Sequence, residues 1–125
     1  MLKDKTSSAI VAVRDLATAR RFYGDTLGLT PTSASDHVIQ YDTGGTTLVV
    51  YVSDQAGTNR ANSVVWDVGD DIERIAAELA TKAVTFERYD MPDTTYANGI
   101  HDTGGFKMVW FKDPDGNILH LNSTN

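Results

Sequence analysis

Three histidines are the residues of this 125-residue chain best suited to acid–base or metal chemistry, because the chain contains no cysteine. They stand at His37, His101 and His120. The absence of cysteine excludes disulfides, thiolate metal sites and cysteine nucleophiles. An imidazole can bind a metal ion, orient a polar group of a ligand, or fill a wall while bonded to another side chain. The elements that carry each histidine decide among these roles.

His120 lies in the segment "KDPDGNILHLN", which predicts a tight turn followed by a β-strand. Pro114 suits the second position of a type I turn, and Gly116 can adopt positive φ. Such a turn fixes the register of a hairpin, and register decides which side chains share a face. His120 is therefore expected to share one face with Ile118, while the neighbouring leucines occupy the other face.

An internal repeat organises the rest of the chain. "SSAIVAVRDL" predicts a strand and then a helix over 16–27 capped by Asp15, and "SVVWDVGDDIERIAAELA" repeats that order with a capping box of Asp70 and Glu73. Each copy ends in strand, glycine turn and strand, "HVIQYDTGGTTLVVYV" and "FKMVWFKDPDGNILHLN". A shift of 55 residues aligns Ser8 with Ser63, and a shift of 71 residues aligns Val49 with His120. The repeat predicts one domain over residues 1–125, built of two modules at about 5–56 and 60–123.

The segment "FERYDMPDTTYANGIHDTGG" has no counterpart in the first copy. A polar, aromatic-rich stretch of this length is either a functional lid or a strand pair, and a strand is expected around 84–88. Tyr89 and Tyr96 would form an apolar cover over a pocket or only anchor the loop. His101 lies beside Asp102, but adjacent side chains on an extended chain point apart, so a catalytic dyad is not expected.

Charge and hydropathy exclude several function classes. The formal net charge of -6 argues against nucleic acid as a partner, and it suits a neutral or cationic small ligand as well as plain solubility. No apolar run is long enough to span a membrane, and "MLKDKTSS" lacks the apolar segment of a secretory signal. A cytoplasmic location is therefore expected.

Three segments carry a resemblance to a known family: "VRDLATARRFYGDTLGL", "DVGDDIERIAAELATKAV" and "WFKDPDGNILHL". The chain resembles the vicinal oxygen chelate superfamily, which includes glyoxalase I, extradiol dioxygenases and bleomycin-resistance proteins. This resemblance implies an α+β fold of tandem βαβββ modules, with curved sheets around a cleft, helices outside, and often a homodimer. It also implies that four positions point into the cleft and that Trp66 lies beneath a helix; the four are Ser8, Val49, Ser63 and His120.

Metal-using members of that family place His, Glu or Gln at those four positions. Here His120 is the only good ligand among them, whereas a catalytic metal needs about three protein ligands. His37 and His101 match no ligand position of the family. The sequence therefore predicts no bound metal and no other cofactor.

The leading hypothesis is a metal-independent protein that binds a small molecule, cationic or planar and aromatic, as bleomycin-resistance proteins do. The alternative is a divalent-metal-dependent lyase, isomerase or dioxygenase of the glyoxalase type. A third is a metal-free enzyme with His120 or His101 as general base. The pattern leaves open whether Met108 and Trp110 or the alternate pair, Val109 and Phe111, face the cleft. The predicted ligand-binding residues are Ser8, Val49, Tyr51, Ser63, Tyr96, His101, Met108, Trp110 and His120.

Overall fold

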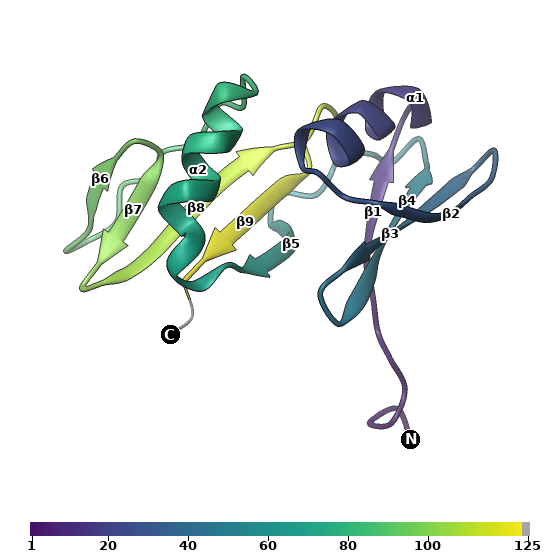
Figure 1. The fold of residues 1–125 in the computed structure, drawn as a ribbon, viewed down its shortest axis with the longest axis horizontal. Coiled ribbons are helices and arrows are strands. Elements are labelled where there is room, and N and C mark those ends of the chain that lie inside the picture. The colour runs from purple at the N-terminus through teal and green to yellow at the C-terminus, as the bar shows by residue number, and fades with distance from the viewer. Residues whose placement is uncertain (124–125) are drawn as a thin grey trace.

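The computed structural model describes residues 1–123, which form two β-sheets set side by side (Figure 1). The first sheet has the strand order β1-β4-β3-β2, with β1 parallel to β4 and the other pairs antiparallel. Its strands are β1 (Ala9–Val13), β2 (Pro31–Ala34), β3 (Val38–Thr43) and β4 (Thr46–Val52).

The second sheet repeats this plan and adds one strand. Its order is β5-β9-β8-β7-β6, again with a parallel pair, β5 and β9, followed by antiparallel neighbours. Its strands are β5 (Asn62–Asp67), β6 (Thr95–Ala97), β7 (Ile100–Thr103), β8 (Phe106–Lys112) and β9 (Ile118–Asn122). The predicted α+β fold of tandem modules is confirmed, with β6 as the extra strand of the second half.

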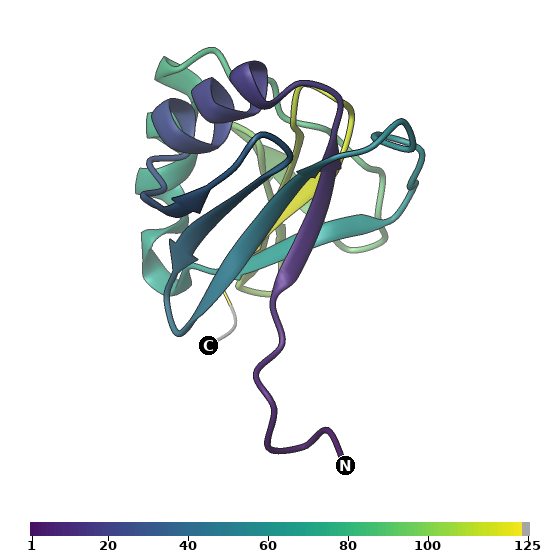
Figure 2. The same ribbon diagram turned by 90° about the vertical axis from the view of Figure 1, so that its right-hand side faces the viewer.

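The helical segments lie on the same side of the two sheets (Figure 2). They are α1 (Leu16–Ala19), its continuation η1 (Arg20–Thr26), the short 3₁₀ turn η2 (Gly69–Asp71) and α2 (Ile72–Thr81). None of the helices in the described part of the chain is long and apolar enough to cross a membrane.

The first helix begins as predicted but changes its winding. The carboxylate of Asp15 accepts hydrogen bonds from the hydroxyl and the N–H of Thr18, and both bonds lower the pKa of Asp15. From Arg20 onward the helix is π-wound, so the N–H of Leu27 donates to the carbonyl of Phe22. Gly28 follows with φ of 74°, as expected for the turn that ends a helix. The apolar spacing of so short a segment cannot separate the two windings.

The predicted capping box of the second helix is wrong. Helix α2 begins at Ile72, and its N-cap Asp71 makes no side-chain capping bond. The carboxylate of Glu73 instead pairs with the ammonium group of Lys107 on β8, which raises the pKa of Lys107. A charged donor on the neighbouring strand forms a stronger bond than a backbone N–H, so tertiary contact overrides the local motif.

One apolar core lies between the helices and the sheets and spans both halves of the chain. Alternate residues of every central strand enter it, and helix residues such as Ala19, Tyr23 and Leu79 pack on them. The remaining strand residues face the side away from the helices, called here the open face. Two apolar side chains are largely exposed there, Ile10 at 60% and Val65 at 58%.

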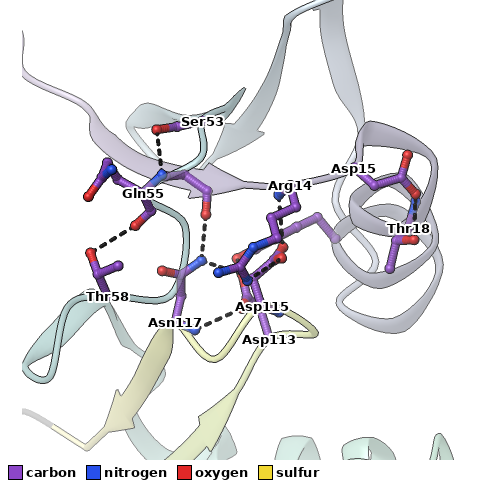
Figure 3. Close-up of polar contacts among 11 residues, drawn as sticks. Arg14, Asp15, Thr18, Ser53, Gln55, Thr58, Asp113, Asp115 and Asn117 are labelled. Carbon is purple, nitrogen blue, oxygen red and sulfur yellow. Dashed lines mark hydrogen bonds and ion pairs between the residues drawn. The ribbon is translucent and has the colours of Figure 1, made fainter.

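The turn "DPDGN" joins the two halves (Figure 3). The amide nitrogen of Asn117 donates to the carbonyl of Ala12 on β1, 2.7 Å away, and the N–H of Arg14 donates to the carboxylate of Asp115. The hydroxyl of Tyr23 donates to the buried carboxylate of Asp113 at 2.6 Å, and burial next to that carboxylate raises the pKa of Tyr23. The group Arg14, Tyr23, Asp113, Asp115 and Asn117 is called the turn junction.

The strand predicted around 84–88 is wrong, because there only Phe86 makes a single bridge, to Phe111. The strand pair of this segment is the β6–β7 hairpin, in which Ala97 pairs with Ile100. Asn98 and Gly99 form its two-residue turn with φ of 54° and 85°. Asn-Gly is the preferred sequence for such a turn, so a usable signal was present in the sequence.

Candidate aromatic binding face

Four rings cross the open face of the second sheet, one from each of β9, β8, β7 and β6. Trp110 pairs in register with His120, and Tyr96 pairs with His101. The ring centroids lie 4.6 Å apart for His120 and Trp110, 5.0 Å for Trp110 and His101, and 4.8 Å for His101 and Tyr96. In this aromatic row, His120–Trp110–His101–Tyr96, one pair of rings is stacked and the other two contacts are edge-to-face. Ring faces of this kind are suited to planar groups.

The alternation on β8 settles which of its residues face the row. Val109 and Phe111 are buried in the core beneath the helices. Met108 and Trp110 therefore face the open side, and Met108 pairs in register with His101. The indole N–H of Trp110 donates to the side-chain oxygen of Asn62 on β5, which fixes the plane of the ring.

Both ring nitrogens of His120 are used within the protein. Nδ1 lies 3.0 Å from the carbonyl oxygen of Val109, and Nε2 lies 3.2 Å from the amide nitrogen of Asn122. A carbonyl only accepts and an amide nitrogen only donates, so the proton sits on Nδ1 and the imidazole is neutral. Burial lowers the pKa of His120, in keeping with this state, although the bond to Val109 acts in the opposite direction.

His101 is fully buried, and only one of its ring nitrogens has a partner. It lies on β7 rather than in a loop over the sheet. Its Nε2 accepts a hydrogen bond of 2.9 Å from the backbone N–H of Tyr89, whose ring stacks over it at 6.1 Å. Its Nδ1 is buried without a hydrogen-bond partner.

The other predicted site residues belong to different strands. Ser63 lies on the edge strand β5, at an irregularity in its pairing with β9. Ser8 precedes β1 and hydrogen-bonds the hydroxyl of Thr47 at 2.7 Å. Val49 and Tyr51 lie on β4, on the side of the first sheet away from the core.

The structure thus gathers part of the predicted set on the second sheet and leaves the rest on the first. The gathered residues are Ser63, Tyr96, His101, Met108, Trp110 and His120. The sequence reading missed Asn62 and Asn122, which orient Trp110 and His120. Asn122 could have been predicted from the sequence, because it follows His120 by two residues on the same strand and so shares its face.

The residues present do not fit a divalent metal of the kind that some family members use. The four positions that the family resemblance assigns to metal ligands hold two serines, a valine and His120, whose nitrogens are already bonded. Within residues 1–123, no three His, Asp or Glu side chains stand close enough to share an ion. Neutral hydroxyls are poor ligands for transition metals.

A groove of about 790 Å³ lies on the helix side of the second sheet, between α2 and the β6–β7 hairpin. Its walls include the small side chains of Ala76, Ala77 and Ala80, and its charged residues include the paired Glu73 and Lys107. None of the three histidines lines it. The groove is therefore separate from the aromatic row.

The sequence matches the family model of the Glyoxalase/Bleomycin resistance protein/Dioxygenase superfamily over residues 6–121. The chain belongs to this superfamily. Its members share the paired-module fold described above, so the family assignment and the observed architecture agree. No curated protein sequence matches the chain.

Solved structures agree with this superfamily fold. The glyoxalase family protein from Enterococcus faecalis is 20% identical with a TM-score of 0.72, covering 98% of this chain and 99% of its own. The fosfomycin resistance protein FosX from Mesorhizobium loti is 14% identical with a TM-score of 0.69, covering 100% and 95%. The lactoylglutathione lyase from Agrobacterium tumefaciens is 16% identical with a TM-score of 0.68, covering 98% and 95%. At these identities the likeness shows the fold alone.

Proposed function

We propose that this superfamily member is a metal-independent protein that binds a small molecule against the aromatic row. One observation carries the proposal. His120 is the single histidine at the four positions assigned to family metal ligands, and both of its ring nitrogens are hydrogen-bonded, to Val109 and Asn122. The row around it presents flat apolar rings instead of ion ligands. Binding in the manner of a drug-sequestering bleomycin-resistance protein needs such a surface and no catalytic group.

The proposed ligand is planar and aromatic, and neutral or cationic. The rings of the row carry negative π faces, which attract cations and repel anions. The formal net charge of -6 acts in the same direction. The predicted residues Tyr96, His101, Met108, Trp110 and His120 are proposed as the contact surface, with Ser63 at its edge.

A second copy of the chain is proposed to close the cleft. The chain is proposed to work as one domain of two modules, about 5–56 and 60–123, in the cytoplasm. The open face exposes Ile10 and Val65, and apolar exposure of this kind suits an interface. In a homodimer, Ser8, Val49 and Tyr51 of the first sheet would form the wall opposite the row. Ile10→Lys should then convert dimer to monomer in analytical ultracentrifugation, and an unchanged mass would reject this arrangement.

The two tryptophans allow a direct test of binding. Trp66 lies on the helix side and Trp110 in the row, so Trp66→Phe leaves Trp110 as the only tryptophan. A planar aromatic cation such as acridine orange should quench the tryptophan fluorescence of that variant. It should leave the emission of the matched Trp110→Phe variant, which reports from Trp66, unchanged.

Metal content tests the rival enzyme. Protein purified without chelator should contain less than one tenth of a divalent ion per chain, as measured by plasma mass spectrometry. A stoichiometric metal that is lost in His120→Gln would overturn the proposal in favour of a glyoxalase-type enzyme.

A further inference from the structure

The unpartnered nitrogen of His101 is the strongest unexplained feature of the molecule. His101 has no solvent exposure, and its Nδ1 has no hydrogen-bond partner. Buried polar groups in folded proteins are nearly always paired, so an exception indicates a missing partner or a specific role. The partner of Nε2 identifies what is missing. Because Nε2 accepts from the N–H of Tyr89, the neutral ring carries its proton on Nδ1. His101 therefore offers a hydrogen-bond donor.

The surroundings of this donor are rings. The rings of Trp110 and Tyr96 make interplanar angles of 84° and 70° with the His101 ring, and the Tyr89 ring lies nearly parallel to it at 25°. A donor among aromatic faces suits a flat molecule that carries one acceptor atom. The negative π faces disfavour an anion, so the acceptor belongs to an uncharged group such as a carbonyl.

Tyr89 stacks on one face of the His101 ring without belonging to a strand. Its side chain is 39% exposed, and it stands between the Phe86 bridge and the start of β6 at Thr95. Its ring stacks on His101, and its N–H is held by the same imidazole. Movement of the Tyr89 ring would uncover that face of the His101 ring without breaking any strand pairing.

We propose that His101 Nδ1–H is the specificity-determining donor of the site, and that it binds the carbonyl oxygen of an uncharged planar aromatic ligand. The ligand lies against Trp110 and Tyr96 after the Tyr89 ring moves aside. This inference rests on the proposed function, because it assigns a ligand class to the same face.

A set of matched probes tests the inference. 2-Acetylnaphthalene and 2-isopropylnaphthalene have nearly the same shape, but only the first has an acceptor oxygen. Pairing a buried donor favours the ketone by about tenfold in dissociation constant, measured by NMR titration of the wild-type protein. 2-Naphthoate, the anionic analogue, should bind more weakly than the ketone. A stronger naphthoate complex would overturn the assignment of an uncharged ligand.

Two substitutions separate the nitrogens of His101. His101→Gln keeps an acceptor near the Nε2 position for the Tyr89 N–H but loses the Nδ1 donor, so the preference for the ketone should fall to about one. His101→Asn places an amide donor near the Nδ1 position, so it should retain most of the preference. Should either variant fail to fold, the wild-type protein still gives an answer. The Nδ1 proton signal of His101 should move downfield with the ketone and not with the hydrocarbon.

The outcomes separate this inference from the function that it rests on. Equal affinity for ketone and hydrocarbon in the wild type, with binding lost in Trp110→Leu, would overturn the role of His101 and leave ligand binding intact. Failure of all three naphthalenes to bind would also overturn the inference. The proposed function is overturned by a different result, a stoichiometric metal that is lost in His120→Gln.

Discussion

The turn junction and the aromatic row are both built from polar and aromatic side chains, yet they differ in how fully those side chains are paired. In the junction, the carboxylate of Asp113 accepts from Tyr23, from the backbone of Asp115 and from both nitrogens of Asn117. On the open face of the second sheet, two buried polar atoms have no partner, His101 Nδ1 in the row and Asn122 Oδ1 beside it. No other buried side-chain polar atom within residues 1–123 lacks a partner.

This difference separates a structural region from the proposed binding region. A paired polar network fixes one arrangement of the two halves of the chain. Unpaired buried groups reduce stability, so folded proteins keep them mainly where another requirement applies. The junction should therefore determine the stability of the protein, and the row should determine what the protein binds.

The largest expected effect comes from removing the centre of the junction. Asp113→Ala leaves the buried Tyr23 hydroxyl and the Asn117 amide without their acceptor, so the free energy of unfolding should fall by about 3 kcal/mol or more. Urea denaturation measures this. Asp36→Ala, at an exposed aspartate, is the matched control and should change stability by less than about 0.5 kcal/mol. A loss below about 1 kcal/mol for Asp113→Ala would remove the distinction between the two regions.

A close backbone approach gives the second largest effect. Gly57 has φ of 74°, and a Cβ there would overlap the carbonyl oxygen of Asp115 in the junction. Gly57→Ala should therefore cost about 2 to 4 kcal/mol in thermal or urea unfolding. Gly45→Ala is the control, because its Cβ would meet nothing within 4 Å. Equal stability of the two variants would mean that the backbone at Gly57 does not approach the Asp115 carbonyl closely.

Much of the fold was predictable because it depends on local patterns. Alternating apolar residues gave the central strands, Asp15 gave the helix start, and the glycine of "DPDGN" gave a turn with φ of 92°. Each signal acts over a few residues, where side-chain direction and allowed φ are set by the chain itself. The hairpin at Asn98 and Gly99 belongs to the same class, and it was missed although its signal was present.

The remaining features depend on contacts between distant residues. Nothing near Asp113 indicates that it accepts from Tyr23, ninety positions away. The ion pair of Glu73 with Lys107 likewise depends on how helix α2 packs beside strand β8. For the site, the face of His120 followed from its register, but the state of its two nitrogens required the positions of Val109 and Asn122. That state is what separates a metal ligand from a wall residue.

Two asparagines give a direct comparison of the regions. The Asn117 amide donates to Ala12 and Asp113, so Asn117→Ala should cost about 2 kcal/mol. Asn122 makes one bond to His120 and leaves its Oδ1 unpaired, so Asn122→Ala should cost less than about 1 kcal/mol. Parallel urea titrations measure the difference. Similar losses for the two variants would show that the unpaired oxygen carries no penalty.

The smallest expected effect is a pH dependence that arises from His120. Burial lowers the pKa of His120 below its ordinary value of 6.5, so the unfolded chain takes up this proton at a higher pH than the folded one. The stabilisation is complete above about pH 6.5 and declines as the pH falls toward the folded pKa. His120→Gln should remove that part of the decline in urea titrations at several pH values, whereas the exposed His37→Gln should retain it. If the dependence of the unfolding free energy on pH were unchanged in His120→Gln, the imidazole would exchange its partners and accept a proton in the folded protein. The hydrogen bonds of the row would then be adaptable, in contrast to the fixed network of the junction.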